Sequence, residues 1–359
     1  MKIIIDSRSN YSYGSFYIDE LRQLAGKHNV SYQLSPFKGL DDLGNDMRFV
    51  CVTDDKQVKC FLHLNDSYKL REMNYEWCDI YGCVNANFNQ YPTDKYPKIV
   101  SLVPSFGVRF EKSLLCLIFN SLVQLSGILP VVLRRAEWNK YKQQMEQNRL
   151  RNIKHYFGRR IKMWQNRLPL SAYENSTPSE DDYIFFLSTL WYNDKYNKND
   201  ERVNLRRAYF IRACKSINTP TTSLQFEGGL LGDQTSSNAK FADVLAKHGE
   251  SFDMWIEKTK RSALVFNTPA FWDCHGWKLG EYLALGKCIV STKLSNDLPY
   301  PLEHGKNIHF VEDSEESMRE AIEYILDHPE YRHKLEQGAK AYWEKYGTPE
   351  ASLKLLGII

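Results

Sequence analysis

Short apolar runs alternate with amphipathic segments along most of the chain. The apolar run at residues 2–6 is followed by a segment that places Ile18, Leu21 and Ala25 at helical spacing, which predicts a strand, a turn and a helix. Further strands are predicted at residues 49–53, 59–64, 81–86 and 98–105. Alternating strands and helices are typical of a parallel β-sheet covered by helices.

A second alternation follows residues 168–181, a polar stretch without apolar periodicity that is typical of a linker. Helices are predicted from Arg202 and near 238–248, and Asp313 can cap a later helix. Strands are predicted at residues 183–189, 222–227, 263–267, 288–292 and 308–312. We therefore expect an α/β protein with two Rossmann-like parallel-sheet domains that face a cleft.

The expected domains are residues 1–170, with an apolar and basic helical segment at 113–167, and residues 180–340. The tail, residues 341–359, is expected to cross back to the first domain. A length of 359 residues suits two domains. With 43% hydrophobic residues, 25% charged residues and a net charge of +3, the chain differs from disordered proteins and from dedicated nucleic-acid binders.

Cysteine usage and the N-terminus favour a cytoplasmic protein. The eight cysteines include no CxxC pair and mostly lie in apolar runs, which predicts buried free thiols in a reducing compartment. The N-terminal sequence MKIIIDSRS has too short an apolar run for a secretion signal.

An apolar stretch followed by a basic one stands out at residues 114–167. Residues 114–133 approach the length of a membrane span but are interrupted by Asn120, Gln124 and Pro130, and residues 134–167 carry eleven basic and two acidic side chains. Such a pattern predicts peripheral contact with the anionic cytoplasmic face of the inner membrane. A core helix followed by a solvated basic helix is the alternative.

The strongest chemical signal lies at residues 263–312. No Walker A, HExxH, GxSxG, GxGxxG, DxD or zinc-spaced Cys/His motif occurs, so metal chemistry is not indicated. A polar loop here precedes a helix N-terminus, where Gly276 lets a diphosphate approach and Lys278 supplies charge. Asp273 and Glu281, seven residues apart, can face one cleft and hold a polar ligand.

The segments DCHGWKLGE, LGKCIV and LEHGKN resemble the C-terminal half of GT-B glycosyltransferases, over roughly residues 180–345. The similarity is to the retaining group with a Glu-x7-Glu motif, the family 4-like or group 1 enzymes, although Asp273 stands where that motif has its first Glu. The run GKCIVSTKLSNDLP also resembles exostosin-like glycosyltransferases, which keeps an inverting mechanism open.

The resemblance implies roles for individual residues. Glu281 would bind the nucleotide ribose and Asp273 would lie by the donor sugar, and these two are the expected catalytic residues. The other expected donor-binding residues are Ser188, Thr189, Lys195, Arg202, Arg206, Arg207, His275, Gly276, Lys278, Glu303 and His304. In the first domain the expected cleft residues are Ser7, Gly14 and Ser15 in the first strand–helix loop, with Arg109, and a general base is expected among Asp6, Asp54, Asp55 and Asp66.

The resemblance predicts transfer of a sugar from a nucleotide diphosphate-sugar to a saccharide acceptor. If the basic segment contacts the membrane, the expected acceptor is lipid-linked, as in synthesis of bacterial O-antigen or capsule. The reaction is expected to be retaining and metal-independent, with the nucleotide-sugar as co-substrate and no cofactor or nucleic acid. The alternatives are a nucleotide-sugar epimerase or hydrolase with the same cleft, and a membrane-associated scaffold without activity.

Overall fold

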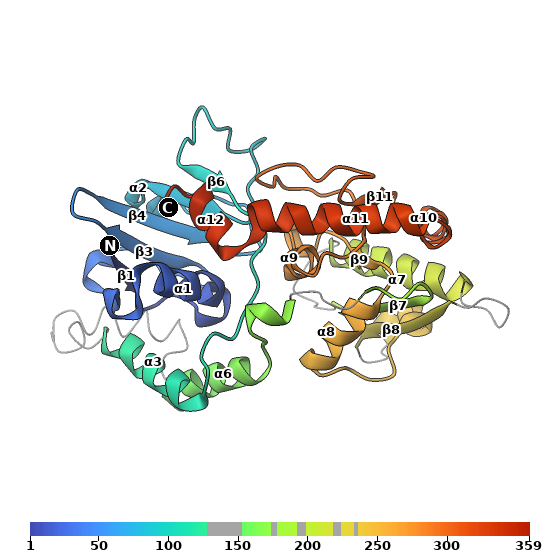
Figure 1. The fold of residues 1–359 in the computed structure, drawn as a ribbon, viewed down its shortest axis with the longest axis horizontal. Helices are drawn as coiled ribbons and strands as arrows, with labels where there is room; N and C mark the ends of the chain where they lie inside the picture. Colours follow the sequence, from blue (N-terminus) through green and yellow to red (C-terminus); the bar gives the residue numbers. More distant parts are fainter. Residues whose placement is uncertain (128–152, 174–177, 192–198, 218–223, 233–235) are drawn as a thin grey trace. The chain divides into compact units, whose positions relative to one another are not determined.

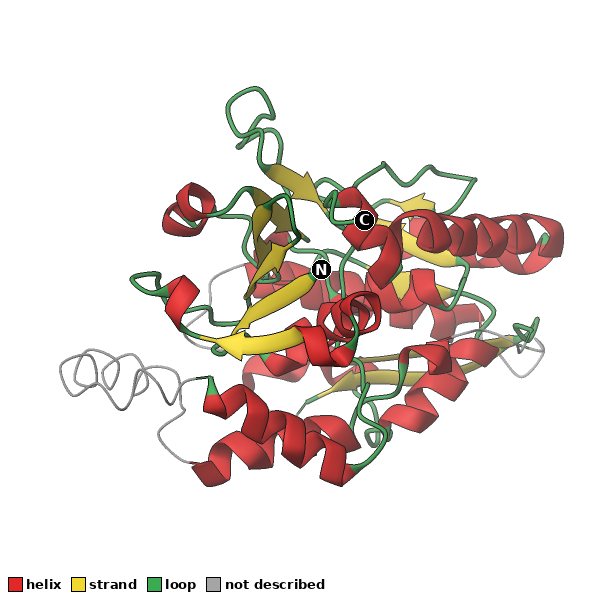
Figure 2. Cartoon of the chain, turned by 60° about the vertical axis from the view of Figure 1, so that its left-hand side comes forward, coloured by secondary structure: helices red, strands yellow, loops and turns green. Residues whose placement is uncertain are grey.

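The computed structural model describes residues 1–127, 153–173, 178–191, 199–217, 224–232 and 236–359. The chain forms two compact units (Figures 1 and 2). The N-terminal unit comprises Met1–Ser171 and Pro349–Ile359, and the C-terminal unit comprises Ala172–Thr348. Both units combine helices with parallel strands, which confirms the predicted α/β fold class.

The N-terminal unit is built on one six-stranded sheet. Its strands are β1 (Lys2–Asp6), β2 (Val30–Gln33), β3 (Met47–Val52), β4 (Gln57–His63), β5 (Ile80–Cys83) and β6 (Ile99–Ser101), in the order β2-β1-β3-β4-β5-β6. Its helices are α1 (Tyr11–Ala25), α2 (Glu72–Trp77), α3 (Leu114–Ser126), α6 (Ile153–Gln165) and α12 (Pro349–Leu355). Short 3₁₀ turns occupy Lys27–Asn29, Ser35–Phe37 and Leu170–Tyr173, the last across the boundary between the units.

The prediction of an all-parallel first sheet is wrong at β3. This strand is antiparallel to both β1 and β4, whereas β1–β2, β4–β5 and β5–β6 pair in parallel. The reason is the connection from β3 to β4, which is a tight turn closed by the Thr53 N–H bonded to the Lys56 carbonyl at 2.9 Å. A turn this short joins antiparallel strands, because a parallel pair needs a crossover of a dozen or more residues.

Helix α1 begins earlier than predicted. The Asn10 side chain caps it by accepting from the N–H groups of Ser12 at 2.8 Å and Tyr13 at 3.2 Å. The first strand–helix loop therefore ends before Tyr11, and the expectation that Gly14 and Ser15 belong to that loop is wrong.

The described residues of the C-terminal unit form two small sheets whose neighbouring strands pair in parallel. Their strands are β7 (Tyr183–Thr189) paired with β8 (Gln225–Leu231), and β9 (Val265–Asn267), β10 (Ile289–Thr292) and β11 (His309–Val311) in the order β11-β10-β9. The Ala263 N–H donates to the Tyr183 carbonyl at 2.7 Å, so the segment entering β9 lies beside β7. The two sheets therefore adjoin along β7 and the segment before β9.

Helices surround these strands. They are α7 (Asn199–Ile217), α8 (Phe252–Arg261), α9 (Trp277–Ala284), α10 (Glu315–Asp327) and α11 (Pro329–Tyr342), followed by a π-helical turn at Trp343–Gly347. The helix predicted near 238–248 is a 3₁₀ helix at Ser236–Val244, and α10 is capped by Ser314 rather than Asp313. Phe186, Phe210 and Phe266 pack at the centre of the core, with Phe210 and Phe266 stacked at a ring-centroid distance of 4.5 Å.

Helix α3 presents apolar side chains outward and polar ones inward. Leu115 is 79% exposed, Phe119 66% and Leu122 51%, whereas Ser121 and Gln124 are buried against α6. In the parts of the chain that are described, no helix combines the length and apolar character needed to cross a membrane. Of the predicted basic segment, Arg134, Arg135, Lys140, Lys142, Arg149 and Arg151 lie outside the described residues.

All eight cysteines are free, and only Cys116 of α3 is exposed, which confirms the prediction of buried thiols for the other seven.

Candidate functional site

Two basic side chains meet at the carboxyl end of β7 in the C-terminal unit. Arg207 of α7 donates from Nη1 to the Thr189 carbonyl at 2.9 Å, and Lys278 of α9 donates from Nζ to the Leu187 carbonyl at 2.6 Å. The carboxyl ends of parallel strands are where open α/β sheets bind ligands. The structure thus brings together Thr189, Arg207 and Lys278, three of the predicted donor-binding residues.

Both cations are partly removed from water. Burial, followed by the positive charge of Arg207, lowers the pKa of Lys278 to about 7, against an opposing effect of Glu281. Burial likewise lowers the pKa of Arg207 to about 10. The Lys278 amine therefore titrates near neutral pH, and a bound anion would stabilise its charged form.

Glu281 lies on α9 beside these cations and is 4% exposed. The Tyr173 hydroxyl donates to its Oε1 at 3.3 Å. Tyr173 comes from the segment predicted as a linker, and sequence reasoning missed it because nothing in the sequence marks a tyrosine in a polar stretch as a partner of Glu281. A buried carboxylate held among donors and cations is well placed to accept hydrogen bonds from a polar ligand.

The predicted catalytic residue Asp273 ends a short, strained 3₁₀ turn, Phe271–Asp273, before α9. Trp272 and Asp273 have backbone φ angles of 50° and 59°, in the left-handed region that residues other than glycine rarely adopt. The Asn296 amide donates to the Asp273 carbonyl at 3.0 Å, and the Arg202 guanidinium pairs with the Asp273 carboxylate. Strain of this kind is concentrated at functional sites, so it supports a role for the turn.

His275 and Gly276 complete the entry to α9. His275 is buried, its Nε2 lies 3.1 Å from the Asn296 carbonyl, and burial lowers its pKa to about 4, so the ring is neutral at pH 7. Gly276 is the N-cap of α9, and no side chain caps this helix. The Gly276 φ of −76° is open to any residue, so the glycine provides space rather than an unusual backbone conformation.

Other predicted donor-binding residues have partners elsewhere. Arg206 bonds Asp313 through Nε at 2.8 Å and Nη2 at 2.5 Å. Glu303 forms an exposed ion pair with Lys306 at 2.7 Å, and His304 Nδ1 accepts from the Phe310 N–H at 3.0 Å. These contacts stabilise local turns and helix packing. Ser188 is buried within β7, and Lys195 lies outside the described residues.

The four cleft residues predicted in the N-terminal unit are spread over it. Ser7 is buried after β1, and Ser15 is buried in α1, where its hydroxyl accepts from the Val108 N–H at 3.0 Å. A Cβ at Gly14 would lie 3.3 Å from the Met47 sulfur, so this glycine allows α1 to pack closely on β3. The Arg109 guanidinium lies over the Trp164 ring, 5.2 Å from its centroid.

The four candidate general bases do not all lie at the same end of the sheet strands. Asp6 is buried and pairs with Arg8 at 2.8 Å and Arg48 at 3.2 Å. Asp54 and Asp55 occupy the β3–β4 turn, next to the start of β1, because Val52 pairs with Lys2. The expectation that they share a cleft with Asp6 is wrong, since the reversal of β3 places them at the opposite edge of the sheet. Asp66 follows the carboxyl end of β4, at the same edge as Asp6.

Across the described parts of both units, no three His, Cys, Asp or Glu side chains group in a way that could hold a metal ion. Arg207 and Lys278 carry positive charge at the end of β7.

Similarity to known proteins is low. No curated protein matches the chain in sequence. A glycosyltransferase from Rickettsia africae is similar in structure at 11% identity, covering 94% of this chain and 79% of its own, with a TM-score of 0.44. The UDP-GlcNAc 2-epimerase from Neisseria meningitidis, bound to UDP-GlcNAc, is similar at 12% identity over 80% of this chain and 63% of its own, with a TM-score of 0.40.

The structure of TarM is similar at 14% identity over 52% of this chain, with a TM-score of 0.36, and the chain spans only 36% of its length. In sequence, residues 209–342, which are less than half of the chain and lie within the C-terminal unit, match the model of the family described as Glycosyl transferases group 1.

Proposed function

We propose that the protein is a GT-B glycosyltransferase that moves a sugar from a nucleotide diphosphate-sugar to a saccharide acceptor. The observation that carries this proposal is the placement of Arg207 and Lys278 at the carboxyl end of β7, beside the buried Glu281. Lys278 and Glu281 both fall inside the segment that matches the group 1 glycosyltransferases.

In this proposal the C-terminal unit binds the donor. The diphosphate lies between Arg207, Lys278 and the uncapped N-terminus of α9, where backbone N–H groups and the helix dipole favour negative charge. Glu281 accepts hydrogen bonds from the ribose, and Asp273 lies beside the donor sugar. These two assignments follow from the resemblance of the Asp-x7-Glu spacing to the family motif.

The proposed chemistry is departure of the nucleoside diphosphate, whose growing negative charge the two cations stabilise. Because Arg207 and Lys278 supply this charge, we propose that the reaction needs neither a metal ion nor another cofactor. The Asp-x7-Glu spacing favours retention of anomeric configuration. An NMR spectrum of the initial product distinguishes retention from inversion.

The test of this function is nucleoside diphosphate release from candidate nucleotide-sugars, measured with and without saccharide acceptors. A glycosyltransferase releases the nucleotide at a rate that rises with acceptor and yields a glycosylated product. Release that is independent of acceptor indicates a hydrolase, and an isomerised donor indicates an epimerase. Either of these results, or no turnover with any donor, contradicts the proposal.

Donor binding should depend on pH through Lys278. The pKa of this lysine is about 7 without ligand, and a bound diphosphate raises it. Binding therefore takes up a proton above pH 7, and affinity should fall by up to about tenfold per pH unit there. Calorimetric titration with a nucleotide-sugar between about pH 7 and about pH 9 measures this effect, because a diphosphate esterified at both ends has no secondary ionisation in this range.

The matched control for this pH dependence is Lys278→Arg, which stays charged throughout the range. Its affinity should be nearly independent of pH above 7. An equally steep decline in wild type and Lys278→Arg would show that another group takes up the proton.

We further propose that the acceptor is lipid-linked and that the enzyme works at the cytoplasmic face of the bacterial inner membrane, in O-antigen or capsule synthesis. The support is the outward apolar face of α3, formed by Leu115, Phe119 and Leu122, next to α6 with its exposed Arg159 and Lys162. Apolar side chains beside cations match the chemistry of an anionic lipid surface.

The triple variant Leu115→Ser, Phe119→Ser, Leu122→Ser should weaken binding to phosphatidylglycerol-containing vesicles by about 100-fold, since each inserted side chain contributes on the order of 1 kcal/mol. Co-sedimentation with vesicles measures this. Met73→Ser, which removes an exposed apolar side chain from α2, is the control and should bind like wild type. Equal binding by the triple variant and wild type would exclude α3 as the contact.

A further inference from the structure

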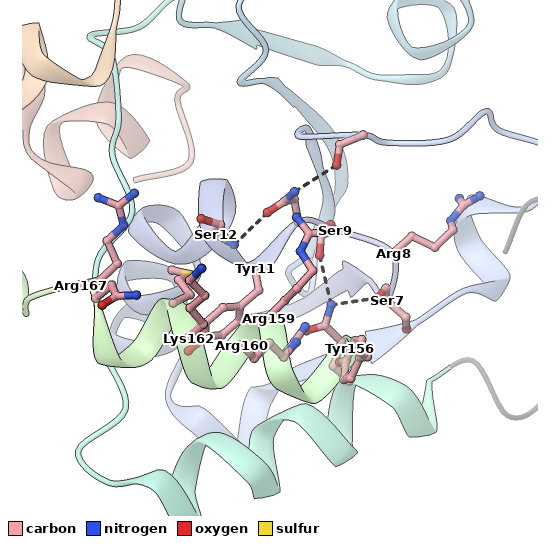
Figure 3. A pocket seen from close by; sticks show the side chains of 15 residues that line it. Ser7, Arg8, Ser9, Tyr11, Ser12, Tyr156, Arg159, Arg160, Lys162 and Arg167 are labelled. Carbon is pink, nitrogen blue, oxygen red and sulfur yellow. Dashed lines mark hydrogen bonds between the residues drawn. The ribbon is translucent and has the colours of Figure 1, made fainter. Parts of the chain in front are cut away.

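A pocket of about 380 Å³ lies in the N-terminal unit, between α6 and the loop that joins β1 to α1 (Figure 3). All the described residues that line it belong to this unit. In Figure 3, Tyr156, Arg159, Arg160 and Lys162 stand on α6 beside the loop that carries Ser9. The volume suits a small organic ligand rather than a single ion.

The pocket is strongly basic. Its basic lining residues are Arg8, Arg159, Arg160, Lys162 and Arg167, and none of the described residues that line it is acidic. Arg8 is neutralised by the Asp6 carboxylate at 2.8 Å. Arg159 and Lys162 are exposed, so their charge is available to a ligand.

Arg160 is the fixed centre of this cluster. It is 6% exposed, its Nη1 donates to Ser121 Oγ at 3.2 Å, and its Nη2 donates to Gln124 Oε1. The Tyr11 and Tyr156 rings flank the guanidinium, with centroids 4.5 Å and 4.4 Å from its central carbon. Among the described residues no carboxylate pairs with Arg160, so a positive charge is buried among neutral groups.

One buried carboxylate near this charge, that of Glu111, is held by other partners and forms no ion pair with Arg160 among the described residues. The Glu111 carboxylate accepts a hydrogen bond from the Tyr11 hydroxyl, and its Oε1 lies 3.5 Å from Asn120 Nδ2. The first turn of α1 carries no acidic side chain, so nothing there opposes the positive end of the helix dipole. Burying an arginine without a carboxylate is costly, and a bound anion removes that cost.

We propose that this pocket binds the phosphate or diphosphate group of a second ligand, separate from the donor. Arg160, held in place by Ser121, Gln124 and the two tyrosine rings, presents its planar donors, and Arg159 and Lys162 supply further charge at the rim. The identification of this ligand as the sugar acceptor rests on the proposed function, whereas the binding of a phosphate group does not.

Calorimetric titration with inorganic pyrophosphate tests the proposal. Wild type should bind pyrophosphate at two sites, the β7 site and this pocket. The double variant Arg159→Gln, Lys162→Gln should keep the first binding event and bind pyrophosphate at this pocket at least about tenfold more weakly, because two cations no longer face the anion there. Lys27→Gln, Lys56→Gln makes the same change in net charge elsewhere in the N-terminal unit and should bind like wild type. Equal binding by all three proteins, or no binding by wild type, would overturn the proposal.

The variant Arg207→Met separates this site from the donor site. It should retain pyrophosphate binding at the α6 pocket even if nucleotide binding is lost. If Arg207→Met alone abolishes pyrophosphate binding, pyrophosphate occupies the β7 site only and the second site does not exist. If no nucleotide binds but pyrophosphate still depends on Arg159 and Lys162, the donor proposal fails and this one stands.

Vesicles identify the source of the phosphate. Phosphatidylcholine vesicles containing phosphatidic acid present a phosphate monoester on a lipid. If pyrophosphate displaces the protein from them and the Arg159→Gln, Lys162→Gln variant fails to bind, the ligand's phosphate is lipid-borne. If the variant binds these vesicles like wild type but loses pyrophosphate, the ligand is soluble. Both results support a phosphate site at α6.

Discussion

Replacing Arg207 with methionine should lower kcat/KM for sugar transfer by about 10²- to 10³-fold, the cost of removing one preorganised group that stabilises developing negative charge. The guanidinium is buried at the carboxyl end of β7 and shares its surroundings with Lys278. Methionine keeps much of the apolar stem and removes the charge. Steady-state kinetics with the preferred donor and acceptor measure the effect.

The neighbouring Arg206 provides a matched control. Its guanidinium bonds Asp313 rather than the end of β7, so Arg206→Met should change kcat/KM by less than about threefold while lowering stability by about 1 kcal/mol. Similar kinetic losses in both variants would mean that α7 acts through its stability and that Arg207 holds no diphosphate.

The second large effect is expected at Glu281. Glu281→Gln should weaken nucleoside diphosphate binding by about 10- to 100-fold, because hydrogen bonds to a charged group contribute about 1.5–3 kcal/mol. Glutamine retains an oxygen for the Tyr173 hydroxyl, so the fold around α9 should survive. Losing the carboxylate also removes the charge that raises the pKa of Lys278, which should shift the pH dependence of binding to lower pH.

Glu257→Gln is the control for this variant, since Glu257 lies exposed on α8 and pairs with Lys260 at 3.2 Å. Its nucleotide binding should equal that of wild type. If Glu281→Gln binds every nucleoside diphosphate as tightly as wild type, Glu281 does not contact the ribose.

Most elements were predictable from apolar periodicity, and the errors have local physical causes. The β3–β4 turn is too short for a crossover, so counting residues between the two apolar runs would have revealed the antiparallel pair. The early start of α1 follows from Asn10, a good N-cap residue, whereas Gly14 resembled a turn glycine. Gly14 lies inside the helix because its lack of a side chain lets α1 pack closely against Met47, a residue distant in sequence.

The candidate site was only partly predictable. Adjacent residues on a helix point about 100° apart, so Arg206 and Arg207 contact different neighbours. The sequence does not say which of the two bonds the strand end, because Arg206 is held by Asp313, far along the chain. Tyr173 and the neutral surroundings of Arg160 were hidden for the same reason, since their partners Glu281 and Gln124 are distant in sequence.

The most direct test of the central claim is the melting temperature of wild type and Arg207→Met with UDP, GDP, ADP, TDP and CMP. A nucleoside diphosphate at about 100 times its dissociation constant adds about 2.7 kcal/mol of stability, which raises the melting temperature measurably. We expect one diphosphate to stabilise wild type and to have little effect on Arg207→Met. If no nucleotide stabilises wild type, or if one stabilises both proteins equally, the β7 site does not bind the donor diphosphate.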